Sequence, residues 1–174
     1  AVSAMGDLEF LFGTQLLEGV KGDIAEIEKQ IFTVEAASYP EDEKASPESI
    51  HLRMHQVPHM FLVVFDGSTV VGYICSTRSV EGTLTEESIS HDVPSGKNVC
   101  IHSVCVAEQR RRQGLALKML AKYKEHLTSL GKDVCERALL MCKQNLVDLY
   151  TKGGFTMVGP SPVVHGADQW FEMK

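Results

Sequence analysis

The chain has 174 residues, of which 44% are hydrophobic, and its 23 acidic residues outnumber its 17 basic ones, for a net charge of −6 at pH 7. A chain of this length and apolar content can bury one good core, so we expect a single domain over residues 1–174. The acidic balance argues against nucleic-acid binding, and we see neither an apolar run long enough to span a membrane nor an N-terminal signal segment. We therefore expect a cytoplasmic protein, and we expect residues 1–4, which precede Met5, to derive from an expression vector.

Neither the cysteines nor the histidines predict a metal site. The five cysteines are odd in number, lie mostly inside apolar runs and have no paired metal-ligand spacing, which predicts reduced core thiols. His51, His55 and His59 recur every four residues and could place three imidazoles on one helix face for zinc. Pro58 ends that helix before His59, however, and no glutamate or cysteine completes the set. We therefore expect no bound metal.

The first half of the chain begins with two predicted helices. Apolar residues recur at helical spacing over residues 21–32, which predicts an amphipathic helix. Residues 36–45 break this pattern and predict a loop. Ser46 and Pro47 then form an N-cap and first-turn pair for a second helix, which runs to about Met54 and which Pro58 ends.

A β-hairpin and a third strand follow these helices. Two β-rich runs, residues 60–65 and 69–75, flank Asp66-Gly67, which predicts an antiparallel pair with a tight turn. Residues 76–97 are polar and predict a long connection that borders the active site. Residues 98–106 predict a buried strand.

The second half of the chain alternates helices and strands. The predicted elements are a helix from Leu115 to its C-cap Gly131, a strand over residues 138–142, a short helix from its cap Asn145 to Lys152, and two strands over residues 155–158 and 169–173. Because a strand, a helix and a strand follow one another, we expect the strands over residues 98–106 and 138–142 to be parallel. This order of elements predicts an α/β fold.

The segment from Arg111 to Ala116, with the sequence RRQGLA, lies between a predicted buried strand and a predicted helix. Gly114 and Ala116 let the backbone approach a ligand closely, and a helix start directs N–H groups and a positive dipole end at an anion. Consecutive arginines are otherwise typical of a solvated basic surface, but isolated positive charge in an acidic chain favours a small local anion. The glycine spacing excludes nucleoside-triphosphate and dinucleotide loops. The segment therefore predicts a phosphate-bearing cofactor.

This segment resembles the motif of the GNAT superfamily of N-acetyltransferases, which is arginine or glutamine, two residues, glycine, one residue, and glycine or alanine. The resemblance implies the GNAT fold, a mixed central sheet flanked by helices in which two parallel strands, here ending at Val106 and Cys142, splay apart. It also implies acetyl-CoA, with backbone groups of residues 104–106 on the pantetheine arm and amides of residues 112–117 on the pyrophosphate. The cofactor-binding residues that it implies are Val104, Cys105, Val106, Arg111, Arg112, Gln113, Gly114, Leu115, Ala116, Leu117, Asn145 and Tyr150.

Longer stretches resemble the arylalkylamine (serotonin) N-acetyltransferases of the non-vertebrate type. These stretches are residues 84–88, 100–106, 139–142 and 150–155. The resemblance implies a small primary amine as substrate, such as serotonin, tryptamine or phenylethylamine, with a polyamine as a further candidate. Phe32, Pro40 and Trp170 match aromatic or loop positions of the amine pocket of this family, although core packing explains each of them equally well. Tyr39-Pro40-Glu41 stands where vertebrate-type members carry a cysteine, proline, leucine loop, so we expect an altered amine pocket that includes Tyr39.

Two side chains are candidates for proton transfer. An alkylamine with a pKa of about 10 is almost entirely protonated at pH 7, so a base must act, and an acid would assist departure of the thiolate. His102, two residues before Val104, is the candidate base or relay, and Tyr150, which matches the family's tyrosine, is the candidate acid. A structural histidine and a half-buried tyrosine are the alternatives. The family has two histidines on this strand, and Cys100 stands in the place of the first. We therefore expect a single histidine, His102, to act together with ordered water.

We expect the acetyl group to pass directly to the amine within a ternary complex of a monomeric enzyme. An acyl-carrying nucleophile such as Cys100, Cys105 or Cys142 is disfavoured, because none has an evident activating base. Two alternatives stay open. The acceptor could be a peptide N-terminus or a protein lysine, or the chain could be a module that binds acyl-CoA without turnover.

Overall fold

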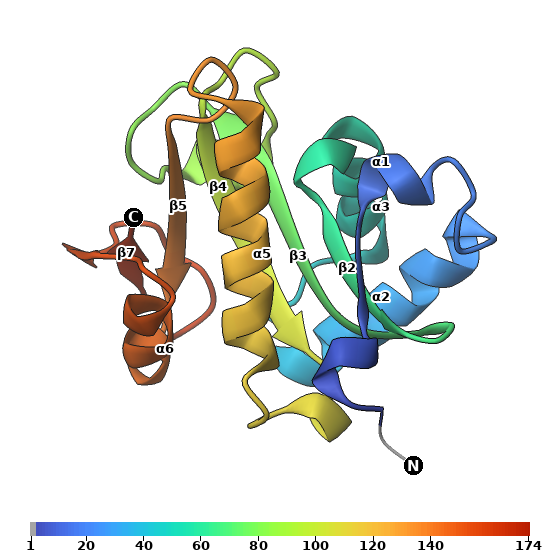
Figure 1. Cartoon of the computed structure of the whole chain (residues 1–174). Coiled ribbons are helices and arrows are strands. Elements are labelled where there is room, and N and C mark those ends of the chain that lie inside the picture. Colours follow the sequence, from blue (N-terminus) through green and yellow to red (C-terminus); the bar gives the residue numbers. More distant parts are fainter. Residues whose placement is uncertain (1–2) are drawn as a thin grey trace. The chain divides into compact units, whose positions relative to one another are not determined.

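The computed structural model describes residues 3–174, and within them seven strands form one mixed sheet in the order β1-β2-β3-β4-β5-β7-β6, accompanied by helices (Figure 1). The predicted α/β class is confirmed. The chain divides into two compact units. The N-terminal unit comprises the chain up to Cys75 and Ser103–Tyr123, and the C-terminal unit comprises Ser76–His102 and Lys124–Lys174. Strands β3 (Thr69–Ser79) and β4 (Asn98–Val106) and helix α5 (Leu115–Leu130) contribute residues to both units.

The N-terminal unit holds the first two strands of the sheet and the first helices. Its further elements are β1 (Glu9–Phe12), α1 (Gly13–Leu16), α2 (Ile24–Ser38), α3 (Pro47–Gln56), β2 (Leu62–Asp66) and the 3-10 helices η1 (Met5–Asp7), η2 (Pro58–Met60) and η3 (Glu108–Arg110). Strand β1 pairs antiparallel with β2. The sequence did not predict β1, because its four residues show no alternation of buried and exposed positions.

Local capping fixes the two helices that precede the hairpin. Helix α2 begins after Asp23, whose Oδ1 accepts a hydrogen bond from Ala25 N at 3.1 Å. It ends at Ser38 rather than near residue 32, because Val34 and Glu35 continue its buried face, so the loop predicted from residue 36 starts too early. Helix α3 starts after Ser46 as predicted, with Ser46 Oγ accepting from Ser49 N at 3.1 Å.

The predicted hairpin is confirmed. Strands β2 and β3 pair antiparallel around a turn in which Gly67 has a φ of +60°, a left-handed conformation that glycine adopts without strain. The register shifts between Val64 and Phe65, which pair with Gly72 and Val70, so the extra residue, Val71, marks a bulge in β3. Strand β3 continues beyond the predicted end at residue 75 to Ser79.

The C-terminal unit contains the remaining strands and two short helices. They are α4 (Glu86–Ser90), β5 (Arg137–Cys142), the 3-10 helix η4 (Gln144–Leu146), α6 (Val147–Lys152), β6 (Met157–Pro160) and β7 (Phe171–Met173). The long connection predicted over residues 76–97 is therefore wrong in part, since it includes the end of β3 and all of α4. A reciprocal pair of hydrogen bonds starts α4, from Ser88 N to Thr85 Oγ1 at 3.1 Å and from Thr85 N to Ser88 Oγ at 2.8 Å.

Strands β4 and β5 are parallel, as predicted from the strand, helix, strand order. Their register begins with Asn98 beside Arg137 and ends with Ile101 beside Leu140. Beyond this ladder β4 continues to Val106 and β5 to Cys142. Pairing at the start of two parallel strands and not at their ends is the arrangement that the splayed strands of the predicted fold require.

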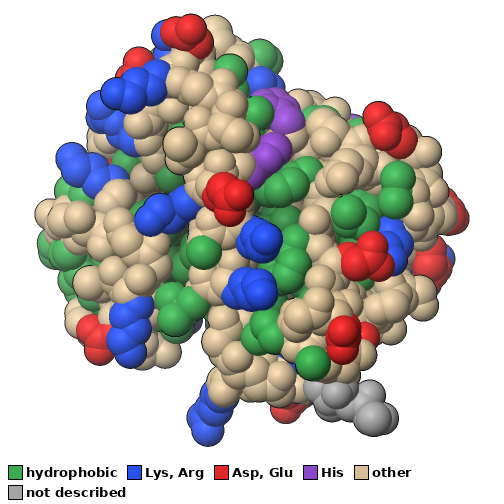
Figure 2. Space-filling view, in the orientation of Figure 1, with side chains coloured by type: hydrophobic (Ala, Val, Ile, Leu, Met, Phe, Trp, Pro, Cys, Tyr) green, Lys and Arg blue, Asp and Glu red, His purple; other side chains and the backbone are tan. Residues whose placement is uncertain are grey.

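Figure 2 shows acidic and basic side chains together on the visible face, in keeping with the net charge of −6. Across residues 3–174, every helix is too short or too polar to cross a lipid bilayer.

Candidate active site

The turn between β4 and α5, residues Arg111 to Gly114, has an uncommon backbone conformation. Among residues 3–174, Arg112 is the one non-glycine residue with a positive φ, at +61°, and Gly114 has a φ of +81°. A left-handed conformation costs a non-glycine residue about 1–2 kcal/mol. A Cβ on Gly114 would meet nothing within 4 Å, so backbone conformation and not space requires glycine there. Left-handed residues of this kind form the backbone nests that bind anions.

Three consecutive arginines, the last residue of η3 and the first two of this turn, have different partners. Arg110 is almost fully buried, and it binds Asp66 Oδ2 at 2.7 Å and the Ser3 carbonyl at 2.6 Å. Hydrogen bonds from Ser3 and then Arg110 lower the pKa of Asp66. Arg111 donates from Nε to the Val106 carbonyl at 3.1 Å and from Nη2 to the Ala37 carbonyl at 3.1 Å. Two of the three arginines therefore hold the turn in place, and Arg112 is exposed.

Helix α5 begins directly after this turn. Leu115 is buried, whereas Ala116 and Leu117 are half-buried, and the first hydrogen bond of the helix runs from Lys118 N to the Gly114 carbonyl at 3.1 Å. The N–H groups of the first turn of a helix have no intrahelical acceptor. The turn and the helix start therefore offer a run of backbone donors together with the positive end of the helix dipole.

Strand β4 presents different side chains on its two faces. Ser103 and Cys105 are buried, and His102, Val104 and Val106 are half-buried. Ser103 Oγ and Cys105 Sγ both donate to Glu35 of α2, at 3.3 and 3.2 Å. Since side chains alternate along a strand, His102 and Val104 face the other way.

Glu35 is a buried carboxylate that the sequence did not single out. Its side chain is 1% exposed, and besides Ser103 and Cys105 it accepts hydrogen bonds from the Tyr73 hydroxyl and from Ala45 N at 2.9 Å. Each carboxylate oxygen thus accepts two hydrogen bonds, which offsets the cost of burying the charge. Burial first, and the Glu35 charge in addition, raises the pKa of Tyr73 and of Cys105.

In the C-terminal unit, His102 is held by a chain of hydrogen bonds. Its Nε2 lies 2.7 Å from Thr77 Oγ1, and the Thr77 hydroxyl donates to the Ser88 carbonyl of α4 at 3.0 Å. Because the single hydroxyl proton goes to Ser88, Thr77 must accept from Nε2–H of His102. In this tautomer the proton of the neutral ring is on Nε2, and Nδ1 carries none. The sequence did not predict Thr77, which lies in the segment expected to be a loop.

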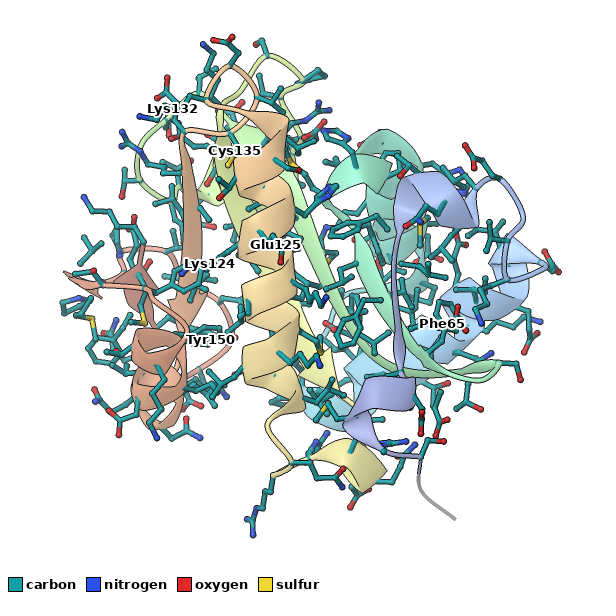
Figure 3. The ribbon with its side chains drawn as sticks, in the orientation of Figure 1. Phe65, Lys124, Glu125, Lys132, Cys135 and Tyr150 are labelled. Atoms are coloured by element: carbon teal, nitrogen blue, oxygen red, sulfur yellow. The ribbon has the colours of Figure 1, made fainter. Side chains whose placement is uncertain are left out.

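Tyr150 and Asn145 lie near the start of the last helix. Tyr150 is a buried residue of α6, labelled in Figure 3, and its ring packs edge-on against Phe155 with centroids 6.0 Å apart. Asn145 does not cap α6 as predicted. It is exposed within η4, and the N-cap is Leu146, without a side-chain hydrogen bond. The 3-10 turn delays the helix to Val147, which leaves Asn145 outside the capping position.

The cysteines of the described residues are all free, and burial raises the pKa of each of their thiols. The pKa of Cys100 and that of Cys142 rise to about 11. A nucleophilic cysteine needs a depressed pKa. The thiols are therefore in the wrong ionisation state to carry an acyl group at neutral pH.

The four residues predicted to bind the amine fall in both units. Phe32 is half-buried on α2 and lines a cavity of about 390 Å³ with Glu28 and Pro47, and Tyr39 and Pro40 follow α2 directly. Trp170, in the C-terminal unit, is buried, and its Nε1 donates to the His165 carbonyl at 2.6 Å. Local packing therefore accounts for Trp170 as well as a substrate role does.

The predicted cofactor and catalytic residues also divide between the units. Residues 104–106 and 111–117 belong to the N-terminal unit, and His102, Asn145 and Tyr150 belong to the C-terminal unit. A separate cavity of about 470 Å³ in the C-terminal unit is lined by Lys124 and Cys135, labelled in Figure 3, and by Arg137 and Phe155 among others. None of the predicted site residues lines this cavity.

Comparison with known proteins identifies the family of this chain. The model of the acetyltransferase (GNAT) family matches residues 23–155. Serotonin N-acetyltransferase of Mesocricetus auratus is 32% identical over 117 residues, which are 67% of this chain but only 56% of that relative. The chain therefore spans little more than half the length of the relative.

Solved structures share the fold at low sequence identity. The loading GNATL domain of CurA from Lyngbya majuscula has a TM-score of 0.76 at 12% identity, covering 95% of this chain and 96% of that one. A chain of the NatC complex bound to Gag peptide and CoA has a TM-score of 0.69 at 14% identity, with 96% of each chain covered. Since the family model spans residues 23–155, most of the sequence, this chain belongs to the acetyltransferase (GNAT) family.

Proposed function

We propose that this protein is an acetyl-CoA-dependent N-acetyltransferase that transfers acetyl directly to a small primary amine. The observation that carries the proposal is the turn from Arg111 to Gly114, whose left-handed residues lead from β4 into the start of α5. This turn combines backbone donors with a helix dipole, which suits a diphosphate. The β4–β5 ladder, which stops at Ile101, leaves the later part of β4 available to hydrogen-bond an extended pantetheine arm.

In this proposal, residues of the chain bind the cofactor mainly through the backbone. Amides of residues 112–117 hold the pyrophosphate, and backbone groups of residues 104–106 hold the pantetheine. Arg111 supports the turn through the Val106 and Ala37 carbonyls, in addition to any contact of its own with the phosphates. Bound acetyl-CoA supplies the acetyl group and a thiolate leaving group.

Two residues handle protons in the proposed reaction. His102 accepts a proton from the ammonium group of the substrate, directly or through one water, on the Nδ1 that its bond to Thr77 leaves in the accepting state. The free amine then attacks the thioester carbonyl, and the carbon–sulfur bond breaks. Tyr150 donates its hydroxyl proton to the departing sulfur, and the second proton of the attacking nitrogen, lost as the amide forms, restores the Tyr150 hydroxyl through water. His102 releases its proton to solvent. No cysteine becomes acylated, in keeping with the raised thiol pKa values.

We infer that the acceptor is an arylalkylamine, with a polyamine as the second small-molecule candidate. The similarity to a serotonin N-acetyltransferase supports this choice, and the net charge of −6 suits a cationic substrate. One observation favours a different acceptor, since the structural relatives include a complex bound to a peptide. We propose that the enzyme acts as a cytoplasmic monomer.

The proposed activity is tested by thiol release from acetyl-CoA with tryptamine, phenylethylamine, spermine and a lysine peptide. We expect the arylalkylamines to have the highest kcat/KM. A preference for the peptide would select the alternative acceptor, and CoA binding without thiol release for any amine would select a non-catalytic module. Ping-pong kinetics would exclude direct transfer, and an unaltered pH–rate profile in His102→Gln would remove His102 from the mechanism.

The binding turn is tested separately by calorimetry with CoA. Gly114→Ala places a Cβ on a residue with a φ of +81°, so we expect about tenfold weaker CoA binding through distortion of the turn. Gly131→Ala is the matched control, because Gly131 has a φ of +84° and equally open surroundings but lies at the other end of α5. Equal CoA affinity in the two variants would place the diphosphate elsewhere.

A further inference from the structure

A cluster of metal-ligating side chains lies between α2 and α3, outside the proposed catalytic residues. Glu28 comes from α2, and His51 and His55 come from successive turns of α3. Glu28 Oε1 lies 3.2 Å from His51 Nδ1 and 3.3 Å from His55 Nε2. The ring centroids of the two histidines are 4.2 Å apart. Three ligand atoms of types that zinc prefers therefore point toward one another.

The spacing of these atoms matches what a tetrahedral cation requires. Zinc binds histidine nitrogen and carboxylate oxygen at about 2.0–2.1 Å, so the edges of its coordination tetrahedron are about 3.3 Å long. The two edges that meet at one carboxylate oxygen, Glu28 Oε1, are 3.2 Å to His51 Nδ1 and 3.3 Å to His55 Nε2, and the ligand atoms of all three residues lie within 4.8 Å of one another. A small rotation of one imidazole would close the third edge.

The surroundings of the cluster suit a partly open site. The Glu28 side chain is 14% exposed, whereas those of His51 and His55 are 56% and 38% exposed. The carboxylate is therefore held by the protein, while water can reach the histidine side as a fourth ligand. Basic side chains of the same helices have partners of their own, Lys29 with Glu26 at 3.8 Å and Arg53 with Cys75 Sγ at 3.7 Å.

From the sequence, we considered a zinc site in this region with a different set of ligands, namely His51, His55 and His59. His59 was the third histidine of the spacing, and the structure places it in η2 beyond the end of α3, as Pro58 predicted. The expectation that no glutamate completes the set was wrong, because Glu28, 23 positions before His51, contacts the pair from the neighbouring helix. Sequence spacing along α3 alone does not show a ligand that α2 supplies.

We infer that Glu28, His51 and His55 bind a divalent transition-metal cation, with Zn²⁺ as the preferred ion and water as the fourth ligand. Two imidazoles and one carboxylate suit zinc, whereas Mg²⁺ and Ca²⁺ prefer sites made of oxygen alone. The cation joins α2 to α3 and so restrains the loop of residues 39–46 between them. It is a structural clamp, and it takes no part in the proposed acetyl transfer.

The test is zinc titration of the full chain without an affinity tag, followed by calorimetry, together with Co²⁺ absorption. We expect one equivalent of zinc to bind, and Co²⁺ to give visible bands of tetrahedral nitrogen and oxygen ligation without a thiolate charge-transfer band. At a zinc concentration about one hundred times Kd, we expect the Tm to rise by about 5 °C. Absence of binding, or thiolate bands from the cysteines, would overturn the assignment.

Substitutions assign the ligands. His51→Gln, His55→Gln and Glu28→Gln should each weaken zinc binding at least about tenfold and remove the rise in Tm. His91→Gln is the matched control, because His91 is an exposed histidine of the C-terminal unit, and it should bind zinc as the wild type does. Circular dichroism checks that each variant is folded. Unchanged affinity in both His51→Gln and His55→Gln, or its loss in His91→Gln, contradicts the site.

Discussion

Two polar clusters include neighbouring residues of β4. They differ in how deeply they are buried and in whether a side chain can gain or lose a proton. In the N-terminal unit, Ser103 and Cys105 donate to Glu35, whose carboxylate is 1% exposed and accepts two hydrogen bonds on each oxygen. In the C-terminal unit, His102 is half-buried and is held by Thr77 through neutral groups. A buried carboxylate whose oxygens all accept hydrogen bonds makes the surrounding structure rigid, whereas a half-buried imidazole can gain and lose a proton. One strand therefore supports stability on one face and is suited to chemistry on the other.

The largest expected effect lies in the Glu35 cluster. Glu35→Ala leaves the Tyr73 hydroxyl, the Ser103 hydroxyl and the Ala45 N–H without their acceptor inside the core. We expect the free energy of unfolding to fall by about 3–5 kcal/mol, measured by urea denaturation. Glu26→Ala, at an exposed position of the same helix, is the control and should change it by less than about 0.5 kcal/mol. If Glu35→Ala also lowered kcat strongly per folded molecule, the Glu35 cluster would serve catalysis as well as stability, contrary to this comparison.

Glu35 also shows where sequence reasoning stops. Its partners Ser103 and Cys105 lie 68 and 70 positions away, so the cluster exists only once α2 packs on the sheet. From the sequence, an acidic residue near the end of a helix is simply a solvated side chain. Thr77 was missed for a related reason, because its bond to His102 depends on how β3 and β4 meet.

Local signals, by contrast, were reliable. The bounds of β4 and α5 were predicted well, because the signals for them, a long apolar run and a C-cap glycine at Gly131, depend only on residues close together in the sequence. The N-cap of α3 at Ser46 was equally local. The short elements β1 and α4 were missed because four or five residues show no period, and Asn145 was misplaced because a 3-10 turn and a cap share the same residues.

The second effect concerns the acid of the proposed reaction. Tyr150→Phe removes one hydroxyl and keeps the ring packed against Phe155. We expect kcat to fall about 100-fold, because general acid catalysis contributes at least this much, while the Kd for CoA stays close to that of the wild type. Thr151→Ala, at the next and exposed position of α6, should leave kcat unchanged. Unchanged kcat in Tyr150→Phe would remove the tyrosine from the mechanism.

A smaller effect tests whether Thr77 positions His102. Thr77→Val removes the acceptor of Nε2–H, and a neutral hydrogen bond of about 1 kcal/mol corresponds to a fivefold fall in kcat/KM. The imidazolium form loses a charge-assisted bond, so the acidic limb of the pH–rate profile should move to lower pH. Thr77→Ser keeps the hydroxyl and should restore both quantities. A uniform loss of rate at every pH, with no rescue by serine, would make Thr77 a packing residue only.

The smallest effect involves Cys100, which lies on the same face of β4 as His102. Burial raises the pKa of Cys100 from 9.0 to about 11, so the folded state favours the neutral thiol. The corresponding stability is fully present below about pH 9 and is lost as the pH rises from 9 toward 11. In Cys100→Ala we expect a shallower fall of the free energy of unfolding over this range, measured by denaturation at successive pH values. Cys135→Ala, at a half-exposed thiol, is the control and should change this slope less. If the free energy of unfolding fell equally steeply with pH in Cys100→Ala and in the wild type, Cys100 would be solvated. A solvated thiol could itself exchange protons, which would weaken the proposal that His102 is the proton acceptor on this face.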